Sequence, residues 1–289
     1  MIARASTRPA KESWITMGDF SAFAEMERRS WSDTTRASGY VALFASAPDQ
    51  AIEGLLAAAG AEGALKALDL CCGQGNVSEA LLGRGCHVVG VDFSPAMLAF
   101  ARKRARNATF IEADVQNLPF GDAEFDVVVS NLGVCHVPDQ PRALAEARRV
   151  LRSGGKFAMT VWCGPEKSPC FAAVYSAIRR HGHPDISAPA GPDFHQFARP
   201  DVAVKLLSAA GFSNIDVTTV DCVWNLNAPE DLFEIYAKGT VRAAMLLSKQ
   251  PPNNVAAIRF ALTAAVREQF SSGDRWCVPV PAALVRASA

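Results

Sequence analysis

The sequence predicts an α/β fold built on a doubly wound, mostly parallel sheet of seven strands. Between residues 64 and 163, short apolar runs alternate with segments of helical periodicity, which is the pattern of βαβ units. One of these runs, FDVVVSN at residues 125–131, is apolar on both faces, as a central parallel strand covered by helices on both sides would be. We therefore expect a Rossmann-like core, with a helical N-terminal lid and an inserted helical cap around it.

The first part of this core can be followed element by element. The expected strands are ALKALDL, HVVGVD, TFIEA, FDVVVSN and KFAMTVWC. The expected helices lie at residues 76–84, 94–106 and 140–151. Ser94 and Pro95 fit the cap and the first turn of the second helix.

Beyond residue 164 the alternation becomes irregular. Residues 165–200 are rich in Pro, Gly and His and are expected to form a loop with one helix near residues 172–180. The following segments indicate a helix at 201–212, one strand at 214–224, and helical patterns over 232–247 and 255–266. The chain ends in an extended segment whose Pro279 and Pro281 suit an edge strand.

Composition excludes several classes of protein. The 289 residues are 49% hydrophobic, and 29 Lys and Arg balance 29 Asp and Glu, so no global basic field would attract nucleic acid. The apolar runs are too short to span a bilayer, and the first residues have no apolar core of a secretory signal. None of the 8 cysteines forms a C-x-x-C pair. We expect reduced thiols and a cytoplasmic protein; composition leaves the oligomeric state open.

The stretch LDLCCGQGNV, residues 68–77, joins the first strand of the core to the first helix through a glycine-containing turn. Gly73 and Gly75 would let the backbone approach a ligand closely, and the helix N-terminus favours an anionic group. This arrangement fits either a dinucleotide or S-adenosylmethionine. Asp69 favours the second, because a carboxylate would repel a pyrophosphate and attract an ammonium or a sulfonium.

Two further acidic residues lie at strand ends. Asp92 ends the second strand, where one carboxylate can hold two ribose hydroxyls. This position supports an adenosine ligand without separating the two candidates. Asp114 follows the third strand, where a side-chain acid can accept the adenine amino group, which again favours S-adenosylmethionine.

Together these motifs resemble class I S-adenosylmethionine-dependent methyltransferases, and especially the group that includes ubiquinone- and menaquinone-biosynthesis-type and other small-molecule methyltransferases. The motifs are Asp69-x-x-x-Gly73-x-Gly75, Asp92, Asp114-Val115, FDVVVSNLGVCHVPD and LRSGGKFAMTVW. The resemblance covers residues 60–162 and, more weakly, 200–222. One departure is Cys71, which stands where the family often has glycine.

The resemblance implies S-adenosyl-L-methionine as cofactor and assigns a part of it to each motif. The residues expected around the methionine part are Asp69, Cys71, Gly73 and Gly75. Those expected around the ribose and adenine are Asp92, Phe93, Asp114 and Val115. Asn131 and Leu132 end the fourth strand, where the family brings the methyl group to its acceptor.

His136 is the candidate catalytic residue, because it follows the fourth strand and histidine titrates near neutral pH. The alternative is that CHVPD only shapes the loop. His181, His183 and His195 lie in the irregular insert without supporting carboxylate or cysteine spacing, so we expect no metal site.

Six aromatic residues precede the core, and we interpret them as part of a mobile lid over an apolar acceptor pocket: Trp14, Phe20, Phe23, Trp31, Tyr40 and Phe44. The expected organisation is an N-terminal helical lid (1–50), a cofactor-binding Rossmann-like core (51–164), an irregular insert (165–200), a core continuation (201–226), a helical cap (227–272) and a C-terminal edge strand (273–289).

The predicted function is methyl transfer from S-adenosylmethionine to an oxygen, nitrogen or carbon of an apolar small-molecule acceptor. Three alternatives remain, because a fold does not fix a function. They are a non-methylating enzyme such as a cyclase on the same fold, a NAD-dependent oxidoreductase, and a cofactor-binding regulator without chemistry. Turnover to S-adenosylhomocysteine would separate the methyltransferase from the others.

Overall fold

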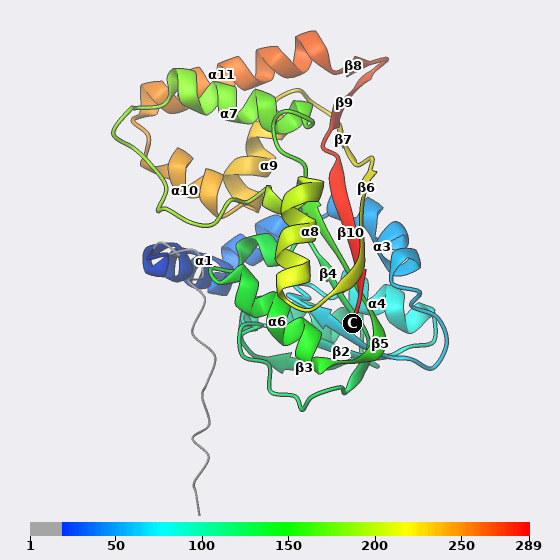
Figure 1. Ribbon diagram of the computed structural model, residues 1–289. Coiled ribbons are helices and arrows are strands. Elements are labelled where there is room, and N and C mark those ends of the chain that lie inside the picture. Colours follow the sequence, from blue (N-terminus) through cyan, green and yellow to red (C-terminus); the bar gives the residue numbers. More distant parts are fainter. Residues whose placement is uncertain (1–18) are drawn as a thin grey trace, which may run out of the picture.

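The computed structural model describes residues 19–289, and its main sheet has seven strands in the order β3-β2-β1-β4-β5-β10-β6 (Figure 1). Their bounds are β1 Lys66–Leu70, β2 His87–Asp92, β3 Thr109–Glu112, β4 Phe125–Asn131, β5 Leu151–Trp162, β6 Ser213–Val220 and β10 Ala282–Ser288. Strands β1 to β5 pair in parallel, and β10 runs antiparallel to β5 and β6. The prediction of a seven-stranded, mostly parallel sheet is confirmed.

Helices cover both faces of this sheet. On one face, α3 (Ile52–Ala58) and α4 (Asn76–Gly83) bury their apolar residues against β1, β4 and β5, and α5 (Pro95–Arg104) packs beside α4. On the other face, α6 (Gln140–Val150) and α8 (Pro200–Ala209) pack on the same strands. The strand order reverses between β1 and β4, and in open α/β sheets ligands bind at the carboxyl ends of the strands beside such a reversal.

The N-terminal segment and the later insertions surround this carboxyl end. The N-terminal elements are α1 (Ser21–Ser32), α2 (Thr34–Gly39), η1 (Tyr40–Phe44) and η2 (Pro48–Ala51). The cap consists of α7 (Pro169–His181), α9 (Asp231–Gly239), α10 (Arg242–Lys249) and α11 (Pro252–Gln269), which gather at the top of Figure 1. A small sheet in the order β7-β9-β8 flanks them, with bounds Val223–Leu226, Arg275–Pro279 and Ser271–Ser272. The short turns η3 (Val134–His136) and η4 (Gln196–Ala198) complete the described elements.

The C-terminal segment differs from its prediction as an edge strand. Strand β10 lies between β5 and β6 and pairs with both along its length. Pro279 and Pro281 precede it, so every residue of β10 keeps the N–H that an interior strand needs. Its side chains are almost all buried, although the two nearby prolines suggested an exposed edge.

Two other predicted elements are divided in the structure. The strand expected at 214–224 separates at Asp221 into β6 of the main sheet and β7 of the small sheet. The helix expected at 232–247 breaks at Thr240, whose hydroxyl donates to the carbonyl of Tyr236 and accepts from the amide of Ala244. Among residues 19–289, no helix is long and apolar enough to cross a membrane.

Candidate active site

The turn after β1 brings backbone to the rim of a cavity. Cys71, Gly73 and Gly75 have positive φ angles of 54°, 52° and 83°. A Cβ at Gly75 would lie 3.0 Å from the Cα of Ala101 in α5, so glycine permits the close packing of α4 on α5. A Cβ at Gly73 would meet nothing within 4 Å. Gly73 lines the cavity, so its open side faces the space available to a ligand.

Asp69 does not line this cavity. Its carboxyl group is buried, only 1% exposed, and accepts a 2.6 Å hydrogen bond from the hydroxyl of Ser78 in α4. Burial raises the pKa of this carboxyl to about 7, so it carries less negative charge than the sequence argument assumed. Asp69 and Gly75 both fix α4 behind the turn, and their contact with the ligand stays a prediction.

Asp92 lies at the carboxyl end of β2 and does line the cavity. Its Oδ2 accepts the amide of Gly73 at 2.9 Å, and its Oδ1 accepts the amide of Ser94 at 2.8 Å. Burial raises the pKa of Asp92, although the amides of Ser94 and Gly73 act in the opposite direction. Each carboxylate oxygen has more than one acceptor site, so Asp92 can still receive hydroxyl donors.

The first cavity measures about 120 Å³ and lies at the carboxyl ends of the strands around β1. It brings together nearly all the residues that the motifs selected: Cys71, Gly73, Asp92, Phe93, Asp114, Val115, Asn131, Leu132 and His136. Segments that are distant in the sequence thus converge on one site.

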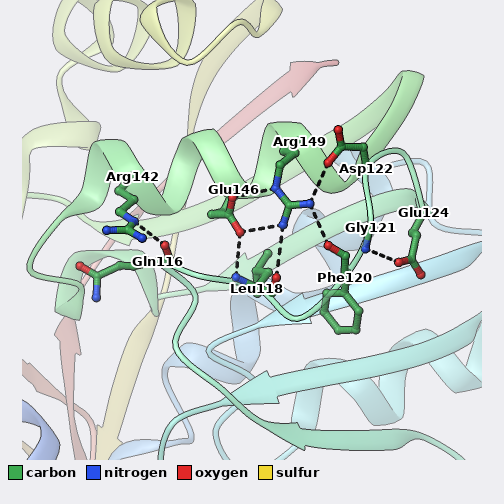
Figure 2. A network of polar contacts seen from close by, with 9 residues as sticks. All are labelled: Gln116, Leu118, Phe120, Gly121, Asp122, Glu124, Arg142, Glu146 and Arg149. Atoms are coloured by element: carbon green, nitrogen blue, oxygen red, sulfur yellow. Dashed lines mark hydrogen bonds and ion pairs between the residues drawn. The ribbon is translucent and has the colours of Figure 1, made fainter.

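Asp114 and Val115 stand on a loop that α6 holds in place. Figure 2 shows Arg149 bonded to the carbonyls of Leu118 and Phe120 and to the carboxylate of Glu146, which itself accepts the amide of Leu118 at 2.8 Å. Arg142 donates to the carbonyl of Gln116 at 2.7 Å. These bonds fix the course of the loop directly after the cavity-lining residues.

The end of β4 approaches the β1 turn very closely. The oxygen of the Asn131 side chain accepts from the hydroxyl of Thr160 at 2.5 Å, while its amide nitrogen donates to the carbonyl of Pro48. Leu132 then adopts a φ of 57°. A Cβ at Gly133 would lie 2.3 Å from the Cβ of Cys71, so only glycine allows this approach. Cys71 and Leu132 both line the cavity and both have a positive φ without being glycine. Strained residues of this kind are often found at functional sites.

His136 pairs with a residue from the N-terminal segment. Its Nδ1 lies 2.9 Å from Oε2 of Glu27, and the indole N–H of Trp31 donates to the same oxygen at 2.9 Å. An ionised carboxylate only accepts hydrogen bonds, so Nδ1 carries the proton and Nε2 of a neutral imidazole is left as an acceptor. Burial alone would lower the pKa of His136, but Cys135 and the Glu27 carboxylate raise it well above the ordinary value.

A second, larger cavity of about 600 Å³ adjoins the first. The charged side chains in its lining are Glu27, Arg179, Asp193 and Arg242, and the aromatic ones are Phe23, Trp31, Tyr40, Phe44, Trp162, Phe171, Tyr175, Phe194 and Tyr236. His195 also lines it and is held by the carbonyl of Trp162 at Nδ1 and the hydroxyl of Tyr175 at Nε2. Burial lowers the pKa of His195, so this ring contributes an uncharged surface at neutral pH.

The two cavities share part of their lining, namely Glu27, Trp31, Tyr40, Leu132 and His136. Sequence reasoning had selected all of these except Glu27. The available signal was its position on α1, between Phe23 and Trp31 on the buried face, four residues from each. A carboxylate is rarely buried without a specific partner. Trp14, predicted to belong to the same aromatic cover, lies outside the described residues.

Two histidines of the insert, His183 and His195, have polar partners in the structure. His183 lies 3.8 Å from the carboxylate of Asp185, and His195 is engaged as above. Within residues 19–289, no group of three or more His, Cys, Asp and Glu side chains is arranged to hold a metal ion.

Comparison with known proteins gives this geometry its context. Residues 68–159 match the family model described as "Methyltransferase domain". A demethylmenaquinone methyltransferase of Thermotoga maritima is 31% identical over 51% of this chain and 69% of its own length. The corresponding enzyme of Thermus thermophilus is 34% identical over 50% of this chain and 73% of its own length.

The chain belongs to the S-adenosylmethionine-dependent methyltransferase family. Among solved structures, phosphoethanolamine N-methyltransferase 2 of Haemonchus contortus in complex with S-adenosyl-L-methionine has the same fold, with a TM-score of 0.58 and 19% identity over 92% of this chain and 59% of that one. The YcgJ protein of Bacillus subtilis has a TM-score of 0.56 and 16% identity, covering 82% and 97% of the two chains. This methyltransferase uses S-adenosyl-L-methionine.

The first cavity of the methyltransferase fits this cofactor on its own chemistry. Asp92 offers carboxylate oxygens for hydroxyl donors, and the ring of Phe93 lines the wall beside it. Gly73 leaves open space where any other side chain would project.

Proposed function

We propose that this methyltransferase transfers a methyl group to an oxygen, nitrogen or carbon of an apolar acceptor bound in the second cavity. The observation that carries the proposal is the wall of residues common to both cavities. Leu132 and His136 belong to it, so a methyl donor in the first cavity and an acceptor in the second would meet beside them. Direct transfer needs such contiguity between donor and acceptor.

The cofactor contacts follow from the lining of the first cavity. Asp92 would hold the ribose hydroxyls, with Phe93 beside the adenosine. Asp114 and Val115 would contact the adenine, and Cys71 and Gly73 the methionine part. Asn131 and Leu132 would form the wall at the methyl group. Asp69 and Gly75 would act indirectly, by fixing α4 behind the turn.

The reacting centre requires alignment and exclusion of water more than activation. Bound S-adenosyl-L-methionine supplies a methyl group that its positive sulfur already activates. The chain contributes aromatic side chains around the acceptor and a base at His136. Because Nδ1 of His136 is engaged by Glu27, Nε2 of the neutral imidazole, which forms above the raised pKa of this ring, would take the proton of an acceptor hydroxyl or amine.

An aromatic ring system suits the walls of the second cavity. Phe44 packs against both Trp162 and Tyr236, with ring centroids 6.2 and 6.3 Å apart, so these wall residues form a connected set of rings. Offset and edge contacts with such rings favour a flat aromatic ligand. Relatives named for demethylmenaquinone and for 2-phytyl-1,4-naphtoquinone support a quinol-like acceptor, whereas another is named for malonyl-[acyl-carrier protein].

Helix α1 would act as the lid of this site. It contacts the first cavity through Arg28, which lies 3.5 Å from the Asp114 carboxylate and 5.5 Å from the centre of the Phe93 ring. The hydroxyl of Ser94 also donates to the carbonyl of Trp31 at 2.6 Å. Because these contacts cover residues assigned to the cofactor, α1 would have to move for the cofactor to enter.

The proposal is tested by supplying methyl-labelled S-adenosyl-L-methionine together with a reduced 1,4-naphthoquinone. We expect labelled product and stoichiometric S-adenosylhomocysteine, and much less of both with the oxidised quinone, which lacks the hydroxyl nucleophile. A panel of phenols, amines and acyl thioesters extends the assay to the other acceptor classes. Tight cofactor binding with no S-adenosylhomocysteine from any class would contradict the proposed methyl transfer.

A matched pair of variants assigns the second cavity. Ala243 lines this cavity and not the first, so Ala243→Trp should obstruct the acceptor while leaving cofactor affinity intact. The control is Ala256→Trp on α11, a position that is exposed and lines neither cavity. Equal acceptor KM values in the two variants would argue against an acceptor site here.

A further inference from the structure

Glu27 is the buried charge whose position the proposed function does not yet explain. Its side chain is 4% exposed, and it projects from the same face of α1 as Phe23 and Trp31. Burying a carboxylate without partners is strongly unfavourable. A residue of this kind in an otherwise apolar stripe therefore indicates a specific task for the charge.

The partners of Glu27 define that task. Both its hydrogen bonds, from Trp31 Nε1 and from His136 Nδ1, end on Oε2 at 2.9 Å. The indole lies edge-on to the imidazole, with ring centroids 5.6 Å apart and an interplanar angle of 87°. Phe194 packs on the imidazole in the same manner, at 5.1 Å. The ring of His136 is thus fixed in orientation from several sides, and its tautomer is fixed by Glu27.

The two members of the pair come from separate parts of the fold. His136 follows β4 in the core, whereas Glu27 lies on α1, which precedes the sheet. Their side chains meet where the two cavities join. Undocking of α1 would remove Glu27 and Trp31 together and leave His136 free to rotate and to exchange tautomers.

We propose that Glu27 is the positioning residue for His136, so that the base is assembled only when α1 is docked over the site. This inference rests on the proposed function, in which His136 takes the acceptor proton. It adds that the lid supplies part of the catalytic arrangement as well as covering it. Opening of α1 for exchange of ligands would then disable the base, and closure would restore it.

The pKa of His136 depends on every titratable group that faces the ring, and Glu27 is one of several. Glu27 faces it from α1, Cys135 adjoins it on its own segment, Asp92 from β2 interacts with it through space, and Tyr40 lines the same junction. Glu27→Gln keeps an oxygen that can accept from both Trp31 and His136 but removes the negative charge. It therefore isolates the electrostatic part of the interaction from the packing of α1.

The first test uses ligand-free protein and needs no acceptor. NMR titration of the His136 imidazole should show a proton on Nδ1 in the neutral form. The pKa of His136 should fall in Glu27→Gln and remain unchanged in Glu25→Gln, an exposed position on the same helix. An unchanged His136 pKa in Glu27→Gln, or a neutral form protonated on Nε2, would overturn the inference.

The second test separates this inference from the proposed function. With a reduced 1,4-naphthoquinone, at a pH above the His136 pKa of the wild type so that the imidazole is neutral in both proteins, Glu27→Ala should lower turnover by about tenfold or more. Combining it with His136→Ala should cause no further loss, because the two residues act as one unit. If His136→Ala itself leaves turnover intact, the proposed base is wrong and this inference is overturned with it. If His136→Ala lowers turnover and Glu27→Ala then lowers it further by its full single-variant factor, only the positioning role is refuted.

Discussion

Replacing Asp69 by Asn should make the protein more stable at neutral and alkaline pH. The carboxyl group has a folded-state pKa of about 7 because it is buried, against an unfolded value of 3.8. The folded state therefore binds more protons than the unfolded state between these values, and the free energy of unfolding falls as pH rises through this window. Asn cannot ionise, so it removes this loss while keeping a polar partner for Ser78.

The size of the effect follows from the same numbers. The two pKa values differ by about three units, and each unit corresponds to about 1.4 kcal/mol, so the stabilisation approaches about 4 kcal/mol above pH 7. Below the unfolded pKa the carboxyl is protonated in both states and the pH-dependent gain vanishes. The observable is thus a difference between variant and wild type that grows with pH.

Urea denaturation at several pH values between about 4 and 8 measures this difference. Asp216→Asn is the matched control, because Asp216 pairs with Arg286 at the surface, where its carboxylate is 46% exposed. That variant reports the general effect of an Asp→Asn exchange at the surface, with which the Asp69→Asn difference is compared. A stability difference for Asp69→Asn that stays flat with pH would refute the argument that burial opposes ionisation of Asp69.

The remaining predictions concern the site. Asp92→Ala should weaken S-adenosylhomocysteine binding by about tenfold or more, since each charge-assisted hydrogen bond contributes about 1.5–3 kcal/mol; unchanged affinity by calorimetry, with an intact fold, would contradict the ribose assignment. His136→Ala should reduce turnover by roughly 10²–10⁴ at unchanged cofactor affinity, and a loss below about threefold would favour a loop-shaping role. Turnover should rise with pH until His136 loses its proton, above the ordinary histidine range, because the cationic form stabilised by Glu27 cannot accept a proton; a limb at an ordinary histidine pKa would disagree. Hydrogen exchange in α1 should slow when cofactor binds, and strong, ligand-independent protection across residues 21–32 would refute the lid.

The sequence was sufficient for the core because each strand and helix there has its own local pattern. FDVVVSN is apolar on both faces and became the central strand β4, and Ser94 caps α5 by accepting the amide of Met97 at 3.0 Å. The order of acids and glycines at strand ends was equally informative, since parallel topology brings such ends together. Most of the residues chosen in this way line one cavity.

Features that depend on distant partners could not be predicted in the same manner. The interior position of β10 depends on pairing with β5 and β6, and the nearby prolines suggested an edge. Strand periodicity could not show that Asp69 lies behind the turn, because its hydrogen bond from Ser78 depends on how α4 packs. The pairing of Glu27 with His136 could not be predicted from local patterns, because the two residues are 109 positions apart in the chain and meet only where α1 docks on the core.

A crystal structure of the protein with S-adenosylhomocysteine would locate each part of the cofactor in the first cavity. We expect adenine beside Asp114 and Val115, ribose hydroxyls on the carboxylate of Asp92, and the sulfur at the wall formed by Leu132 and His136, facing the second cavity. A ligand bound elsewhere, or one whose sulfur points away from that cavity, would contradict this expectation.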